Sequence, residues 1–272
     1  MNVTITTLGG EVYDFSAHGI KTIDFNPDSP SHREKTDEVE GMHGVIDFSE
    51  TLLPRPIKSR FYLEAIDNVD YVLKRNEIFK LLSRKDPFYI QSDTESGKRW
   101  KVKSTGTYSF ERIMANKGFF NVDFTSFLPF AESVGTTQDD FAFSSGLWQV
   151  GQGLTTLEEM KYTHSTTDFR IYNAGDTKIY PQYLPLIITF TGASSNLKIE
   201  NLTTGDVFNY NGSTTTSDVI KIDGVRPTKN SLGIVRQTNK KVITIAEGWN
   251  DFRITGATSP FEISFDFRFY YV

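Results

Sequence analysis

Apolar and polar residues alternate in short runs over most of the chain, which is the pattern of half-buried β-strands. The second half shows it most clearly, because from Asp168 onward the runs are separated by turns rich in Gly, Asn, Asp and Thr. The runs are DFRIYN, PLIITFTG, NLKIEN, DVFNYNG, DVIKIDG, KVITIAEG, DFRITG and FEISFDFRFYYV. Runs of this length and spacing predict a β-sandwich or jelly roll.

The first half adds one helix to a set of predicted strands. A Gly9-Gly10 turn joins alternating residues before and after it into a hairpin over residues 1–25. Further strands are expected near residues 45–48, 57–63, 88–90, 100–102, 107–114 and 119–127. Apolar residues recur at helical spacing from Val69 to Leu82, with Asp67 or Asn68 as the N-cap and Asp86-Pro87 as the stop. The pattern predicts a β-sheet or barrel-like domain with one α-helix.

Two stretches interrupt these patterns. Residues 134–167 are rich in Gly, Ser and Thr with weak periodicity, so we expect a connecting segment. This divides the chain into a domain over 1–133 and a second part, 134–272, which holds the connecting segment and the β-sandwich. The other stretch, 26–40, has two prolines, many charges and a single aliphatic residue. We interpret it as a mobile excursion, or as an arm that becomes ordered against a neighbouring subunit.

Composition fits an ordinary globular protein, with 272 residues of which 38% are hydrophobic and 23% charged. The net charge of -5 argues against a protein held on nucleic acid by bulk charge. The absence of cysteine excludes disulfides, thiolate metal sites and cysteine nucleophiles. The N-terminus lacks the order of a signal peptide, and no stretch approaches the roughly 20 apolar residues that cross a bilayer. We therefore expect synthesis in a cytoplasm, no secretion and no membrane partner.

Motifs for catalysis are missing from the sequence. There is no G-x-S-x-G elbow and no phosphate-binding loop, and Gly151-Gln152-Gly153 lacks the rest of a dinucleotide fingerprint and is expected to be a connector. The histidines have no ligand-spaced partners, and the two adjacent acid pairs are expected to point into water. These residues are His18, His32, His43 and His164, and the pairs Asp139-Asp140 and Glu158-Glu159. We predict no catalytic residue, no metal and no cofactor, and hence no enzyme.

Two tryptophans leave an alternative function open. Trp249 and Trp148 each lie near polar turns, where an exposed ring stacks on the apolar face of a sugar. The alternative is packing at a domain or subunit seam, which we favour. A carbohydrate-binding module that contacts cell-wall glycan therefore remains the second interpretation.

The order of several short motifs resembles the distal tail proteins of siphophages over nearly the whole chain. In the run EGMHGVIDFSETLLPRPIKSRFYLEA, a glycine pair precedes an Arg-x-Ile strand and an aromatic strand. The helix, a Tyr-Ile strand, a Trp-x-Val strand, a Phe-x-Val-x-Phe strand and Pro-x-Ala follow in order. The matching positions are Gly41, Gly44, Arg55, Ile57, Phe61 and Trp100, then Asn173, Gly175, Gly248 and Asn250 in the second half. The charged stretch 26–40 departs from the pattern of the family.

The resemblance implies a structural hub at the distal end of the virion tail. In such a hub, six N-terminal domains form a ring around the tail channel, through which DNA only passes, and a galectin-like C-terminal domain projects outward. The implied partners are further copies of the chain, the major tail tube protein, the tail-associated protein, and receptor-binding or other baseplate proteins. Galectin-type sugar sites carry a histidine, whereas residues 168–272 contain none, which weakens the carbohydrate-binding interpretation.

Overall fold

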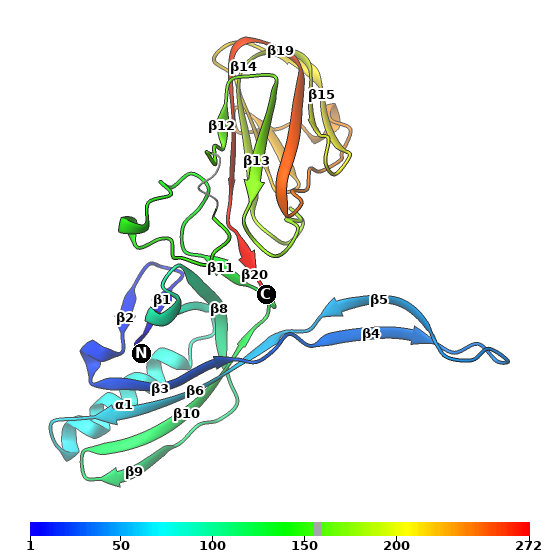
Figure 1. Ribbon diagram of the computed structural model, residues 1–272. Helices are drawn as coiled ribbons and strands as arrows, with labels where there is room; N and C mark the ends of the chain where they lie inside the picture. Colours follow the sequence, from blue (N-terminus) through cyan, green and yellow to red (C-terminus); the bar gives the residue numbers. More distant parts are fainter. Residues whose placement is uncertain (155–158) are drawn as a thin grey trace. The chain divides into compact units, whose positions relative to one another are not determined.

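The computed structural model describes residues 1–154 and 159–272 and forms two compact units, one of residues 1–132 with Val272 and one of residues 133–271 (Figure 1). Each unit has its own apolar core. The fold is mainly β with one α-helix, as the alternating pattern predicts.

Unit 1 is a twisted β-sheet with helix α1 packed on it. Its elements are β1 (Val3–Thr7), β2 (Val12–Asp14), β3 (Ile20–Pro27), β4 (His32–Asp37), β5 (Ile46–Leu52), β6 (Arg55–Glu64), α1 (Asn68–Leu82), β7 (Phe88–Ser92), β8 (Lys98–Thr105), β9 (Phe110–Met114), β10 (Lys117–Ser126) and β11 (Ala131–Ser133). The main sheet has the strand order β2-β1-β7-β8-β10-β6-β3, and β9 pairs with β10. The Gly9-Gly10 turn joins β1 to β2 as predicted. Ile20 does not extend that hairpin, because β3 pairs with β6.

Helix α1 begins at its predicted cap, and only part of its apolar residues are buried against the sheet. The Asp67 carboxylate accepts hydrogen bonds from the backbone N–H groups of Val69 and Asp70, so it caps the first turn. The buried face consists of Tyr71, Ile78, Leu81 and Leu82. Val69 and Leu73 are exposed, so the helical spacing of apolar residues mixes a buried face with an exposed one.

Residues 26–40 form part of a β-hairpin, which matches the arm, one of the two interpretations that the sequence left open. They contain the end of β3 and all of β4, which pairs antiparallel with β5 from His32↔Leu52 to Asp37↔Ile46. The six residues of β4 are all exposed. The sequence lacks the alternation of a strand here because neither face of this two-stranded sheet is buried within the chain. We call residues 32–52 the arm (Figure 1).

Unit 2 is built around two long strands that bend. Its elements are β12 (Thr163–His164), β13 (Asp168–Asn173), β14 (Leu186–Asn201), β15 (Asp206–Thr214), β16 (Val219–Asp223), β17 (Arg226–Lys229), β18 (Leu232–Gly233), β19 (Gly248–Phe267) and β20 (Tyr270–Tyr271). The strand order is β12-β19-β14-β16-β17-β18, with β13 on β19 and β15 on β14. β14 and β19 each combine two of the predicted runs, and their register shifts after Gly192. A Cβ at Gly192 would lie 2.6 Å from the Cβ of Phe261, so glycine permits the close crossing.

The run KVITIAEG alternates like a strand, yet among the described residues it pairs only at an isolated bridge between Ile245 and Ile179 and at Gly248, where β19 begins. Side chains bind the backbone at Thr244 and Ala246. The Asp206 carboxylate accepts from the N–H of Thr244 at 3.0 Å, and the Asn201 amide donates to the Thr244 carbonyl at 2.8 Å. Asn250 binds both the N–H and the carbonyl of Ala246, each at 2.8 Å. Ile243 and Ile245 are buried, and these side-chain hydrogen bonds satisfy backbone groups of the run without a continuous strand partner.

Replacement of Asn250 by alanine should destabilise unit 2 by about 3 kcal/mol, because the amide is fully buried and its loss leaves backbone groups without partners. Urea unfolding monitored by tryptophan fluorescence measures the change. Asn211→Ala is the matched control, since Asn211 is exposed on β15, and it should shift stability by less than about 0.5 kcal/mol. Equal effects from the two variants would refute the role given to Asn250.

Candidate functional site: the arm, its anchor and the surfaces around it

The arm leaves the sheet through a short anchor between β3 and β6. The backbone N–H of Asp28 donates to the carbonyl of Pro56 at 2.9 Å, and that of Leu53 donates to the carbonyl of Ser31 at 2.9 Å. Lys58 forms an exposed ion pair with the Asp28 carboxylate at 3.0 Å. These bonds join residues 28–31, between β3 and β4, to residues 53–56 at the start of β6.

Arg55 fixes this anchor to the core of unit 1. Its Nε donates to the Asp28 carbonyl at 2.6 Å, and its guanidinium lies 4.9 Å from the ring centroid of Trp100. Trp100 is buried on β8, so the contact joins the root of the arm to the sheet. Burial lowers the pKa of Arg55, while Glu95 and Asp28 act to raise it. An arginine keeps its charge through a shift of this kind, so the cation–π contact persists at neutral pH.

The end of the arm carries apolar side chains that are partly exposed. We call residues 37–48 the arm tip. Its turn contains Gly41 and Gly44, both with left-handed backbone (φ 85° and 88°). The exposed apolar residues of the tip are Val39, Met42, Val45, Ile46 and Phe48, and the Phe48 side chain is 57% exposed. Apolar residues concentrated at the end of a projecting hairpin are typical of a contact with another protein surface.

The six sequence-predicted residues of unit 1 gather on the arm and the strands that hold it. Gly41 and Gly44 shape the tip, whereas Arg55 and Trp100 meet at the root. Ile57 and Phe61 point inward from β6 and are fully buried, and the Phe61 ring packs against Phe15 and Phe120. These positions are structural, because they form the arm, its anchor and the core below it.

The four predicted residues of unit 2 stabilise turns. Asn173 accepts from the N–H of Gly175 at 3.0 Å and donates to the Thr177 carbonyl at 3.0 Å. A Cβ at Gly175 would meet the backbone of Tyr270 at 2.6 Å, so only glycine fits there. Gly248 has φ 74° at the start of β19, and Asn250 organises the loop before it.

The two tryptophans differ in exposure. Trp148 is 2% exposed, stacks on Phe141 at 4.7 Å, and donates through Nε1 to the Asp140 carbonyl at 2.9 Å. Its ring belongs to the core of unit 2 and presents no face to a ligand. Trp249 is half-buried on β19, beside Tyr172 at 4.9 Å and with the Arg170 guanidinium 4.4 Å from its ring centroid.

The other candidate groups lie apart from one another. His18 stacks on Tyr13 at 3.9 Å and His164 on Phe169 at 4.2 Å, while His32 and His43 are exposed in the arm. Asp139 and Asp140 are exposed, and Glu158 of the other acid pair lies outside the described residues. Within residues 1–154 and 159–272, no group of three or more His, Asp or Glu could hold a metal ion.

Gly151-Gln152-Gly153 is an ordered turn, although the sequence suggested a flexible connector. Gln152 is buried, and its side chain accepts from the backbone N–H of Gln149 at 2.7 Å. The Tyr271 hydroxyl donates to its carbonyl at 3.0 Å. In the described part of the chain, no helix has the length and apolar character needed to cross a membrane.

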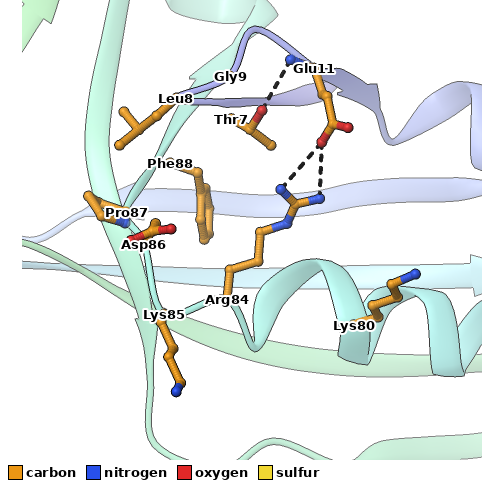
Figure 2. Close-up of a pocket in the computed structure, with 10 residues that line it drawn as sticks. All are labelled: Thr7, Leu8, Gly9, Glu11, Lys80, Arg84, Lys85, Asp86, Pro87 and Phe88. Atoms are coloured by element: carbon orange, nitrogen blue, oxygen red, sulfur yellow. Dashed lines mark hydrogen bonds and ion pairs between the residues drawn. The ribbon is translucent and has the colours of Figure 1, made fainter.

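A basic hollow in unit 1 gave no signal in the sequence (Figure 2). It has a volume of about 560 Å³ and lies between the β1–β2 turn and the residues that follow α1. Arg84 reaches across to Glu11 at 3.3 Å, while Lys80 and Lys85 line the hollow without an ion-pair partner among the described residues. Lys80, Arg84 and Lys85 look in the sequence like the usual basic end of a helix, so only the fold reveals the hollow.

Comparisons with known proteins follow the division into units. Residues 13–126 match the family model of the phage tail protein RIFT-related domain. Unit 1 therefore resembles this phage tail domain over most of its length. The whole chain resembles the crystal structure of the Dit protein of phage SPP1, described as a paradigm of the hub adsorption apparatus in phages that infect Gram-positive bacteria. The two are 12% identical with a TM-score of 0.71, over 98% of this chain and 99% of that one.

A chain of the phage P2 baseplate in its activated conformation with calcium is 8% identical, with a TM-score of 0.47, over 98% of this chain and 97% of that one. No curated protein sequence matches. The resemblance to siphophage distal tail proteins that the motif order indicated is confirmed by the phage tail domain together with the fold shared with the SPP1 protein. Both units of this chain lie within the shared fold, because the match spans nearly its full length.

The Arg55→Ala variant should loosen the arm without unfolding the sheet. It removes a charge-assisted hydrogen bond and the contact with Trp100, so backbone amides of β4 and β5 should exchange with deuterium about tenfold faster. Hydrogen exchange read by mass spectrometry measures this change. Lys58→Ala serves as the control and should have little effect, because its ion pair with Asp28 is exposed. If the amides of β4 and β5 exchange at the same rate in Arg55→Ala as in the unaltered protein, Arg55 does not anchor the arm.

Proposed function

We propose that this protein is a structural hub of a siphophage tail tip, in which six copies form a ring around the tail channel. The observation that carries the proposal is the arm, a β-hairpin whose apolar tip is exposed among the described residues. A phage tail domain and the fold of a hub protein over the full chain agree with this role.

The arm supplies the kind of contact that a ring requires. In a closed ring, each copy meets its neighbour through two different surfaces, one that projects and one that receives. The arm projects from β3 and β6, and its anchor keeps the direction defined. Burial of the tip against a neighbour would remove its apolar side chains from water, which favours association.

The proposed location is the distal end of the virion tail, after synthesis in the host cytoplasm. The domain over residues 1–133 would form the ring, with one face toward the major tail tube protein and the other toward the tail-associated protein. The part over residues 134–272 would project outward and carry receptor-binding or other baseplate proteins. The ring would let DNA pass and would act as a scaffold, with no enzymatic role.

Removal of the arm should abolish ring formation. His32 and Leu52 are register partners, so an Asn-Gly turn in place of residues 33–51 closes the hairpin at its root. We expect the full chain to form hexamers and the shortened chain to stay monomeric, because the shortened chain lacks the projecting surface. Light scattering gives the mass, and negative-stain images test for a six-fold ring with a central hole.

Circular dichroism and the thermal unfolding of the shortened chain provide the control, since its main sheet should remain intact. A hexamer that survives loss of the arm would show that the ring contact lies elsewhere. A full-length chain that never exceeds a monomer at any concentration would contradict the ring itself.

A second candidate function is glycan binding by unit 2. Trp249, Tyr172 and Arg170 lie on one outward face of β13 and β19, and an aromatic pair beside a guanidinium is suited to a sugar ring. The exposed fraction of Trp249 favours it over Trp148 as the platform.

Binding of the full chain to a cell-wall glycan array should be lost in Trp249→Ala, because the sugar-stacking ring disappears. Tyr183→Ala is the control, since Tyr183 is 53% exposed elsewhere in unit 2 and should leave binding unchanged. If the unaltered protein binds no glycan on the array, this second function is rejected.

A further inference from the structure

We propose that the basic hollow of unit 1 receives the arm tip of a second copy of this chain. This contact rests on the proposed ring and gives it a receiving surface. The tip, residues 37–48 of one copy, would enter the hollow between the β1–β2 turn and the end of α1 of the next copy.

The charge of the tip is acidic. Residues 37–48 contain four acids, Asp37, Glu38, Glu40 and Asp47, and neither lysine nor arginine. Asp37, Glu38 and Glu40 are exposed at the same end of the hairpin as the exposed apolar residues. Ile46 and Phe48 alternate on β5 and so share one face of the hairpin. A partner surface for the tip must therefore offer both positive charge and apolar area.

The hollow offers both. Lys80 and Lys85 line it, and neither forms an ion pair with another described residue, so their charges are available to an incoming carboxylate. Leu8, 53% exposed, and Pro87 supply apolar surface, and the buried Phe88 belongs to its lining. Arg84 and Glu11 neutralise each other across the hollow. Of the remaining charged residues in its lining, the two lysines outweigh Asp86, so the hollow is positively charged.

A second apolar surface competes for the tip. Ile66, Val69 and Leu73 form an exposed patch at the start of α1, which we call the helix patch. This patch adjoins Asp67 and Asp70, whose charges have the same sign as those of the tip. Charge therefore favours the basic hollow.

The positions of tip and hollow suit a head-to-tail contact. The arm arises from β3 and β6 at one end of the strand order, whereas the hollow is built on β1, β2 and β7 toward the other end. The projecting and receiving surfaces are thus made by different strands, as a closed heterologous ring requires.

The absence of cysteine makes a direct test simple. The double variant Met42→Cys/Lys85→Cys, treated with a short bismaleimide, should give a ladder of covalent species up to the hexamer on a denaturing gel. An equal mixture of the two single variants should stop at the dimer, because each copy then carries only one of the two thiols. Each single variant alone should give no such product.

Charge reversal gives an independent readout. Lys80→Glu/Lys85→Glu should raise the protein concentration at half-assembly by at least about tenfold, and Glu38→Lys/Glu40→Lys in the same chain should restore assembly. Arg75→Glu, on the same helix but outside the hollow, is the matched control and should leave assembly unchanged. Circular dichroism confirms that each variant is folded.

The outcomes separate this proposal from the ring itself. Hexamers by light scattering, together with cross-linking of Met42→Cys to Leu73→Cys and not to Lys85→Cys, would overturn the hollow as receptor and leave the ring intact. Hexamers with no cross-link at either position would also overturn it. A chain that gives neither an oligomer nor a cross-link overturns both proposals.

Discussion

The pairing of β3 with β6 at the root of the arm is the constraint on which the proposed role depends. A hairpin that projects from a sheet can make a defined contact with another subunit only if the core fixes its direction. Arg55 provides this by binding the Asp28 carbonyl and lying over the buried ring of Trp100. The guanidinium is held by a cation–π contact and by the hydrogen bond that its Nε donates. Because Arg55 lies on β6 and binds the backbone that follows β3, it holds both ends of the arm to the sheet.

In unit 2, side chains form hydrogen bonds with the backbone of a buried segment that lacks a continuous strand partner. Asn201, Asp206 and Asn250 bind the backbone of residues 244–246 in place of a ladder. The buried amides of Asn201 and Asn250 also bind each other at 3.1 Å, so two loops are stabilised by one network. These side chains come from the ends of β14 and β19 and the start of β15, which ties the loop to the long strands.

The sequence predicts the elements that depend on the local pattern of residues. It does not predict the features that depend on contacts between segments distant in the chain. The Asp67 cap, the single helix and most strands follow from short-range chemistry and alternation. The helical spacing did not separate the buried face of α1 from the exposed Val69 and Leu73. β4 was missed because a strand with two solvent-facing sides has no alternation. KVITIAEG was predicted as a strand, although Ile243, Thr244 and Ile245 are buried in succession. The basic hollow could not be predicted, since it joins residues 7–11 to residues 80–88 only through the fold.

The energetics of the arm favour assembly that is all or none. Full burial of an apolar side chain contributes about 1.5–3 kcal/mol, and the tip offers five such side chains, each already partly covered. Association costs about 4–15 kcal/mol in lost translational and rotational freedom, so one arm in one hollow gives at most a weak dimer. In a closed ring, each copy is held by its own arm and by that of its neighbour. Release of one contact then leaves the copy in place at high effective concentration, which favours reclosure. A weak contact of this kind suits a hub, because open chains dissociate and correct themselves while the closed ring persists.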